Sequence, residues 1–246
     1  MDFHEIEEKL NFWHFPHEGA WHLGTIGNFP IDLNPKTLIV TWLTMILVAV
    51  FAVCATRNMA MKKPNSLQVA FEMFYDFISD IVKEQITDPA KAMTFLSIPL
   101  TYFIFILFSN LLGLIPTLTS PTADLNTTVG LALCAFLLFE LFGIYYKGGK
   151  HFKHYLQPYV FFLPINIIED LSKPVTLSFR LYGNIFAGEV LLLVILGLMP
   201  TVLIYFGGFV IPVVWMAYSI FVGFIQAYVF TILSTVYVSQ KISDTH

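Results

Sequence analysis

Arg180 is a permanently charged side chain inside a long, mostly apolar segment, residues 159–199. At the centre of a bilayer, a charged group costs at least about 2.5 to 3.5 kcal/mol on insertion scales, so its presence there calls for a functional explanation. On a helix, the nearest acid on the same face is Glu169, eleven residues away and about 16 Å along the axis. A guanidinium stays protonated when desolvated, and without a local counter-ion it would favour the ionised form of an acid on a partner molecule.

Polar side chains repeat on the Arg180 face of this predicted helix, and one acid lies on the other face. At 100° per residue, a single stripe contains Glu169, Lys173, Thr176, Arg180, Asn184 and Gly188. Glu189 follows Arg180 by nine residues, which is two and a half turns, so their side chains point to opposite faces about 13 Å apart. This arrangement suits an Arg180 that faces a partner and a Glu189 that lines a separate aqueous path.

Two further polar residues, Ser219 and Gln226, lie seven residues apart in the next apolar segment and share a helical face that could meet the Arg180 helix. For these two residues and for Asn184, simple interhelical hydrogen bonds worth about 0.6 to 2 kcal/mol each are an equally good explanation. Arg180 is therefore the residue with the strongest claim to a functional role.

The composition is that of an integral membrane protein. Apolar residues make up 57% of the 246 residues, charged residues only 12%, and the mean hydropathy is +0.72. A net charge of −4 without a basic cluster argues against nucleic acid as a partner. Cys54 and Cys134 fall in separate apolar segments and predict no disulfide or metal site. The N-terminal segment, residues 1–36, lacks the basic start of a signal peptide, and we predict that it is retained as an external segment.

We predict an all-α fold with five transmembrane helices in a single transmembrane domain covering 1–246. Three runs are long and apolar enough to cross about 30 Å of hydrocarbon, namely 37–56, 95–115 and 128–146. Between the first two, residues 67–87 place polar and apolar side chains on opposite helical faces, which predicts an amphipathic helix in the membrane interface.

The last two apolar segments, 159–199 and 201–238, are too long for an upright helix. Each would reach nearly 60 Å as one continuous helix, about twice the thickness of the membrane. Pro and Gly residues interrupt both segments and can bend or break a helix. We expect a steeply tilted helical hairpin that turns near Pro200.

The distribution of basic residues predicts the orientation, because cytoplasmic loops accumulate Lys and Arg. In the five-span topology only Lys9 and Lys36 fall on one side of the membrane. The other side carries Arg57, Lys62, Lys63, Lys83, Lys91, Lys147, Lys150, Lys153 and Lys241. We therefore predict an external N-terminus and a cytoplasmic C-terminus.

Five sequence blocks together resemble the a subunit of F-type ATP synthases. They are the ATR that closes the first span, NLLGLIP at 110–116, PTADLNTT at 121–128, SKPVTLSFRLYGNIFAGE at 172–189 and IQAYVFTILSTVYVS at 225–239. The RLYGNIFAGE block with a downstream QAYVF is highly specific. The resemblance implies an ion-translocating stator subunit that forms two half-channels, for protons or sodium ions, against a rotating ring of c subunits. It further implies peripheral-stalk b subunits and the remainder of the ATP synthase complex as partners, and a bacterial plasma membrane as the location.

The resemblance also implies roles for individual residues. Arg180 is expected to separate the half-channels, with Asn184 and Gln226 in support. Glu189 is expected in the outer half-channel, with Asp124 and Asn126 as weaker candidates there. Some family members have histidine at the position of Ser219, so a proton relay through that histidine does not transfer to this chain. Toward the inner end, the candidates for channel lining are Glu169, Asp170 and Lys173.

Two other classes of function compete with this interpretation. A self-contained secondary ion-coupled transporter would also use broken helices and a charge at mid-membrane, but it predicts inverted repeats, and the two halves of the chain show no matching interrupted segments. A membrane enzyme with buried haem or quinone would need paired histidines within the spans, and all seven lie outside them. Without a phosphate-binding loop, we expect no direct nucleotide binding, and we predict neither a cofactor nor a metal at the N-terminal histidines His4, His14, His17 and His22.

Overall fold

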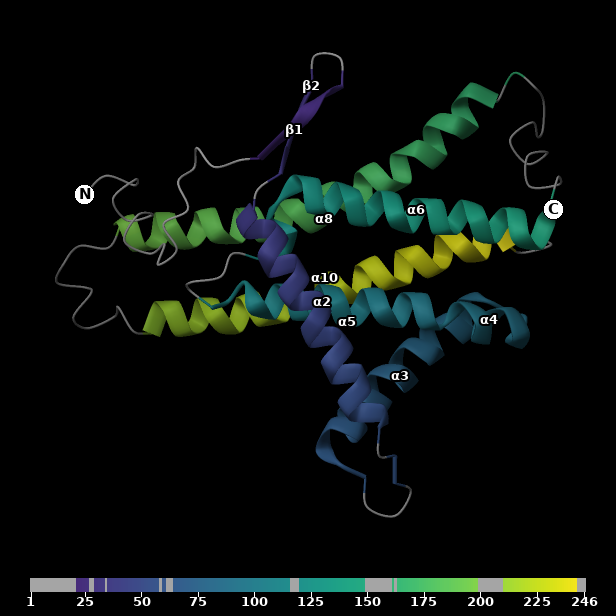
Figure 1. Ribbon diagram of the computed structural model, residues 1–246, viewed down its shortest axis with the longest axis horizontal. Coiled ribbons are helices and arrows are strands. Elements are labelled where there is room, and N and C mark those ends of the chain that lie inside the picture. The colour runs from purple at the N-terminus through teal and green to yellow at the C-terminus, as the bar shows by residue number, and fades with distance from the viewer. Residues whose placement is uncertain are drawn as a thin grey trace.

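The computed structural model describes residues 21–26, 29–33, 35–57, 59–60, 64–115, 120–148, 161, 163–198 and 210–242. Within them the fold is helical apart from one short strand hairpin, so the predicted helical class is confirmed (Figure 1). Four described segments are long and apolar enough to cross a membrane: Thr37–Thr56, Pro89–Leu112, Leu125–Lys147 and Val213–Ile242. The chain is a helical membrane protein.

Helix α2, Pro35–Thr56, covers the first predicted span. Its outer side carries Trp42, Ile46 and Val53, each more than half exposed at 59%, 57% and 58%, as suits a helix that meets lipid. Figure 1 shows α2 crossing the other long helices at a steep angle. If α2 is taken as perpendicular to the membrane plane, the other long helices are strongly tilted in the membrane.

Helix α3, Ser66–Gln85, is amphipathic, and residues such as Ile78 and Val82 on its apolar face are fully buried. Gln68 belongs to the polar residues of this helix, yet it is only 5% exposed. Its side chain accepts a hydrogen bond from the backbone N–H of Ala60 at 3.1 Å and donates one to Glu72 Oε1 at 2.7 Å. These bonds satisfy the amide group, which makes its burial tolerable.

The second predicted span consists of two consecutive helices, α4, Pro89–Phe95, and α5, Ser97–Leu112. It begins earlier than residue 95 because Asp88 caps α4, accepting from the backbone N–H of Ala90 at 3.0 Å, with Pro89 in the first turn. A 3-10 turn, η1, Pro121–Ala123, precedes α6, Leu125–Lys147. Gly148 ends α6 at a φ of 56°, a left-handed backbone that glycine adopts without strain.

A buried hydrogen-bond network joins α5, η1 and α10, Val210–Ile242. The Asn110 side chain donates to the carbonyl of Gly223 at 3.0 Å and accepts from Thr122 Oγ1 at 3.0 Å. Gly113 allows the η1 segment to approach α5, because a Cβ there would lie 2.5 Å from the Cβ of Ser120. The NLLGLIP and PTADLNTT blocks therefore meet in space.

The two overlong segments form the long helices α8, Leu163–Leu198, and α10. Pro174 lies inside α8 without ending it, and Figure 1 shows the two halves of this helix running in different directions. Side-chain contacts pair Asp170 with Lys241 and Asn184 with Gln226, so α8 and α10 are antiparallel. The expected turn near Pro200 lies outside the described residues.

Helices α5, α6, α8 and α10 share an apolar core. The α10 helix packs mainly on α5 and α6, and α8 packs mainly on α6. Phe103, Phe139, Leu181 and Phe230, one from each of these helices, are at most 2% exposed. This packing holds the polar face of α8 in a defined position.

The strand hairpin was not expected from the sequence. Strands β1, Trp21–Ile26, and β2, Phe29–Leu33, pair antiparallel, with Trp21 opposite Leu33 and Ile26 opposite Phe29. It lies within the segment that the sequence predicts to be external. Residues 1–20, with His4, His14 and His17, lie outside the described part of the chain.

Candidate functional site

Arg180 lies near the middle of α8 with a half-buried side chain. Among the described side chains, no carboxylate forms an ion pair with Arg180. Tyr237 on α10 is close enough for the charge of Arg180 to act on its hydroxyl group. Asp170 is ten residues away, about 15 Å along the helix axis, and is bonded to other partners. Within the described part of the chain the planar guanidinium thus has no carboxylate partner, and its geometry suits two parallel hydrogen bonds to such a group.

Asn184 and Gln226 join α8 to α10 one turn beyond Arg180. Asn184 Nδ2 donates to Gln226 Oε1 at 2.7 Å. Asn184 is exposed, whereas Gln226 is only 2% exposed. Gln226 Nε2 is buried and has no acceptor among the described residues, which costs about 1 to 3 kcal/mol. Within the described part of the chain, the Gln226 amide therefore accepts a hydrogen bond from Asn184 but donates none.

Four charged side chains form a buried ionic cluster between α6, α8 and α10. Lys241 Nζ binds Asp170 and lies 2.8 Å from Glu140 Oε1, and Lys173 Nζ lies 2.6 Å from Asp170 Oδ1. The exposed fractions of the Lys241 and Asp170 side chains are 6% and 11%. Among the described residues the cluster contains two acids and two bases, so their charges balance, and the cluster ties three helices together.

The ionic cluster changes the interpretation of the inner-end candidates. Asp170 and Lys173 are candidates for channel lining, but both use their charges inside the cluster, and Lys173 also stacks over the Tyr237 ring at 5.4 Å. Glu169 precedes Asp170 by one residue, so its side chain points about 100° away from that of Asp170 around the helix axis. It is therefore exposed and does not join the cluster. The predicted single stripe is therefore divided: Lys173 turns toward the cluster, while Glu169, Thr176 and Asn184 remain exposed.

Glu189 lies in α8, and its side chain is outside the described part of the chain. The antiparallel register set by Asn184 and Gln226 places the half-buried Ser219 at the height of residue 191, within one turn of Glu189. Gly188 faces α10 at this height, and a Cβ there would be in ordinary van der Waals contact with the Trp215 ring, at 3.7 Å. The backbone thus brings the Glu189 and Ser219 positions to one level of the hairpin.

Asp124 and Asn126, the weaker candidates, lie at the start of α6 close to α8. Asp124 Oδ1 accepts from the backbone N–H of Asn126 at 2.9 Å and caps the helix, which is a sufficient structural reason for this acid. Ser178 and Thr128 connect α8 and α6 through their hydroxyl groups at 3.4 Å. Because α6 runs antiparallel to α8, its start lies near the level of Arg180 and Asn184.

Sequence reasoning missed Glu140 and Lys241 as members of the site region. Glu140 lies in the third predicted span, and an acid within a span needs a partner. Lys241 is the first base after the last apolar segment, residues 201–238. An acid within a predicted span was the available signal, but the choice of partner requires the relative positions of three helices.

Comparison with known proteins identifies the family. The model of the family described as ATP synthase A chain matches residues 38–239, which include all five sequence blocks. The ATP synthase subunit a of Desulforamulus reducens is 46% identical over 242 residues, covering 96% of this chain and 90% of that protein. The protein of the same description from Staphylococcus saprophyticus is 39% identical over 234 residues, covering 89% and 95%, and that from Listeria monocytogenes is 36% identical over 234 residues, covering 90% and 98%.

Proposed function

Because the chain belongs to the ATP synthase A chain family, we propose that it is the ion-translocating stator subunit of the ATP synthase membrane sector. In this proposal it acts as one component of the complex and leaves nucleotide chemistry to other subunits. It forms two half-channels for protons or sodium ions against a rotating ring of c subunits. The observation that carries the proposal is Arg180, a half-buried cation that no described carboxylate of its own chain neutralises.

Arg180 is proposed to act on the ion-binding carboxylates of the ring. As a ring carboxylate arrives, the fixed guanidinium stabilises its ionised form, so the bound ion leaves into one half-channel. The same positive charge repels cations that would pass directly from one half-channel to the other. Arginine suits this role because it keeps its charge when desolvated, whereas a buried lysine can lose its proton.

Glu189 is proposed to line the outer half-channel, with Ser219 at the same level on α10 and Asn126 and Asp124 near the start of α6. The hydroxyl of Ser219 can donate and accept hydrogen bonds, so it can order water beside a carboxylate but cannot hold a charge as histidine would. Asn184 and the unpaired amide of Gln226 are proposed to orient Arg180 and the water around it.

The proposed topology has five spans, with α8 and α10 as a tilted hairpin against the ring, the N-terminus outside and the C-terminus in the cytoplasm of a bacterial cell. The steep crossing of α2 over the other long helices supports the tilt (Figure 1). Peripheral-stalk b subunits and membrane lipid are the expected neighbours of the faces that do not meet the ring.

Cysteine cross-linking tests the proposed ring contact. Thr176 is exposed on the Arg180 side of α8, so Thr176→Cys is expected to cross-link to a cysteine placed beside the ion-binding carboxylate of the c subunit. Val53→Cys, on the exposed side of α2, is the matched control and should give no c-subunit product. Both variants are made in a background in which Cys54 and Cys134 are replaced by serine, because these two native thiols are exposed and could cross-link themselves. Equal yields from the two sites, or none from Thr176→Cys, would refute the ring contact.

Glu189→Gln is expected to slow ion transport about 10- to 100-fold without abolishing it, because the loss of one proton-transferring group is typically worth this factor or more and water can partly replace it. The measurement is ATP-driven acidification of membrane vesicles across a broad pH range. Rates equal to wild type at every pH would remove Glu189 from the path. Glu72→Gln, on the exposed side of α3, is a control with the same chemical change.

Gln226→Leu is expected to separate stability from transport. Leucine has a similar volume and removes a buried amide donor that lacks a partner, so the free energy of unfolding should stay the same or rise by about 1 kcal/mol. Transport should nevertheless fall several-fold, because Asn184 loses its acceptor beside Arg180. Thermal unfolding of the purified complex and vesicle acidification measure the two effects. A loss of stability with transport retained would assign Gln226 a structural role only.

A further inference from the structure

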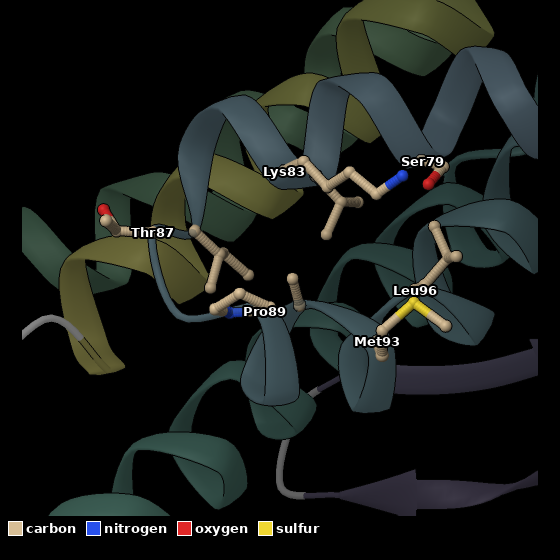
Figure 2. A pocket seen from close by; sticks show the side chains of 9 residues that line it. Ser79, Lys83, Thr87, Pro89, Met93 and Leu96 are labelled. Atoms are coloured by element: carbon tan, nitrogen blue, oxygen red, sulfur yellow. The ribbon is translucent and has the colours of Figure 1, made fainter.

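A cavity of about 400 Å³ lies between α3 and α4, and Arg180 is not among the residues that line it. Its polar lining consists of Ser79, Lys83 and Thr87, and its apolar walls include Val82, Met93 and Leu96. Figure 2 shows the Lys83 side chain extending along α3 toward Ser79, with Met93 and Leu96 on the facing helix. The cavity thus combines one cation and two hydroxyl groups with an apolar wall.

Lys83 has no structural partner that explains its position. It lies in the last turn of α3, its side chain is exposed, and no described carboxylate forms a salt bridge with it. Lys91 on α4 differs, because it lies 3.8 Å from Asp88 and over the Tyr146 ring. The Lys83 ammonium group therefore keeps its donors available for an anion.

The elements that line the cavity are of the kinds expected at the boundary between lipid headgroups and acyl chains. Helix α3 is amphipathic, which is typical of a helix in the membrane interface. The segment Pro89–Leu112, which forms the facing wall, is apolar enough to cross the bilayer. Met93 is 58% exposed at the mouth of the cavity, so its apolar surface meets the lipid phase rather than the protein interior.

We propose that this cavity binds an anionic phospholipid. The lipid phosphate lies on the Lys83 ammonium group, with the hydroxyl groups of Ser79 and Thr87 as further donors, and an acyl chain runs along Val82, Met93 and Leu96. Basic pockets between membrane helices are suited to such headgroups, since each Lys or Arg near an anionic surface strengthens binding. This site goes beyond the proposed ion path and uses none of its residues.

The test measures phospholipid binding to the complete ATP synthase complex. The complex is stripped of lipid in mild detergent and titrated with phosphatidylglycerol or, separately, phosphatidylcholine, and lipid bound to this subunit is counted by native mass spectrometry. Lys83→Gln is expected to weaken phosphatidylglycerol binding about 5- to 10-fold, as one lost charge near an anionic headgroup predicts. Lys83→Arg should retain it, and Met93→Trp should weaken it by filling the cavity while leaving every charge in place.

Arg57→Gln is the matched control, because Arg57 is an exposed base near the end of α2 and does not line the cavity. It should leave phosphatidylglycerol binding unchanged.

Equal losses of phosphatidylglycerol binding in Lys83→Gln and Arg57→Gln would show a general surface-charge effect and overturn the proposal. Displacement of the lipid by millimolar inorganic phosphate would also overturn it, since a simple anion site needs no acyl chain. Unchanged binding in both Lys83→Gln and Met93→Trp would do the same. None of these readouts depends on ion transport, so failure of the lipid site and failure of the ion path are distinguishable.

Discussion

Replacing Arg180 with alanine is expected to lower ATP synthesis by the complex at least about 100-fold, which corresponds to about 2.7 kcal/mol. No described base can take over, because Lys173 and Lys241 are bonded to Asp170. In the proposed mechanism, loss of the fixed charge would leave the ring carboxylates with their ions bound at the point of release. The measurement is ATP synthesis by liposomes that contain the complex, driven by an imposed ion gradient, with the amount of subunit checked by immunoblot.

Arg180→Lys is the conservative control for this result. Lysine restores a positive charge but not the planar group, and in a desolvated site it can lose its proton. ATP synthesis is therefore expected to remain strongly impaired. Wild-type rates with lysine would show that any cation is sufficient, and wild-type rates with alanine would refute the role of Arg180 altogether.

Lys241→Met is expected to lower the free energy of unfolding by about 3 to 5 kcal/mol, because it removes one partner from a buried ion cluster. Glu140 then keeps its charge at 19% side-chain exposure without the ammonium group 2.8 Å away, while Asp170 retains Lys173. Denaturation of the purified complex in increasing sodium dodecyl sulfate, followed by circular dichroism, measures the difference. Fewer assembled complexes in the membrane should accompany it.

Two further variants distinguish the loss of charge balance from the loss of a side chain. The double variant Lys241→Met with Glu140→Gln should recover most of the stability, because the remaining pair, Asp170 and Lys173, is balanced. Lys91→Met should cost about 1 kcal/mol or less, since its pair with Asp88 is long, at 3.8 Å, and the Asp88 side chain is 48% exposed. A Lys241→Met complex as stable as the Lys91→Met complex would contradict the structural importance of the cluster.

The sequence was sufficient to predict most helices of the described residues, and none of the described carboxylates forms an ion pair with Arg180. Apolar runs must lie in lipid, so hydropathy indicates helices such as α2 and α6 within a few residues of their observed bounds. The sequence also indicated the contact between Gln226 and the Arg180 helix, because Ser219 and Gln226 are seven residues apart and so share one face of the last helix.

The ionic cluster could not be predicted from the sequence, because its members are far apart in the chain. Glu140, Asp170 and Lys241 meet only when α6, α8 and α10 pack at one particular register. The division of the polar stripe has a local cause: Asp170 and Lys173 are three residues apart on α8, and the Lys173 side chain is long enough to turn toward Asp170. Hydropathy also gave no signal for the β1 and β2 hairpin, which depends on pairing rather than on burial in lipid.

The most direct test of Arg180 as the barrier between two ion paths is the passive proton flux of liposomes that contain the Arg180→Ala complex without nucleotide. Our account predicts a flux clearly above that of the wild-type complex, and a return to the wild-type level when a blocker of the ring carboxylate is added. A flux as low as that of the wild-type complex before any blocker is added would contradict it.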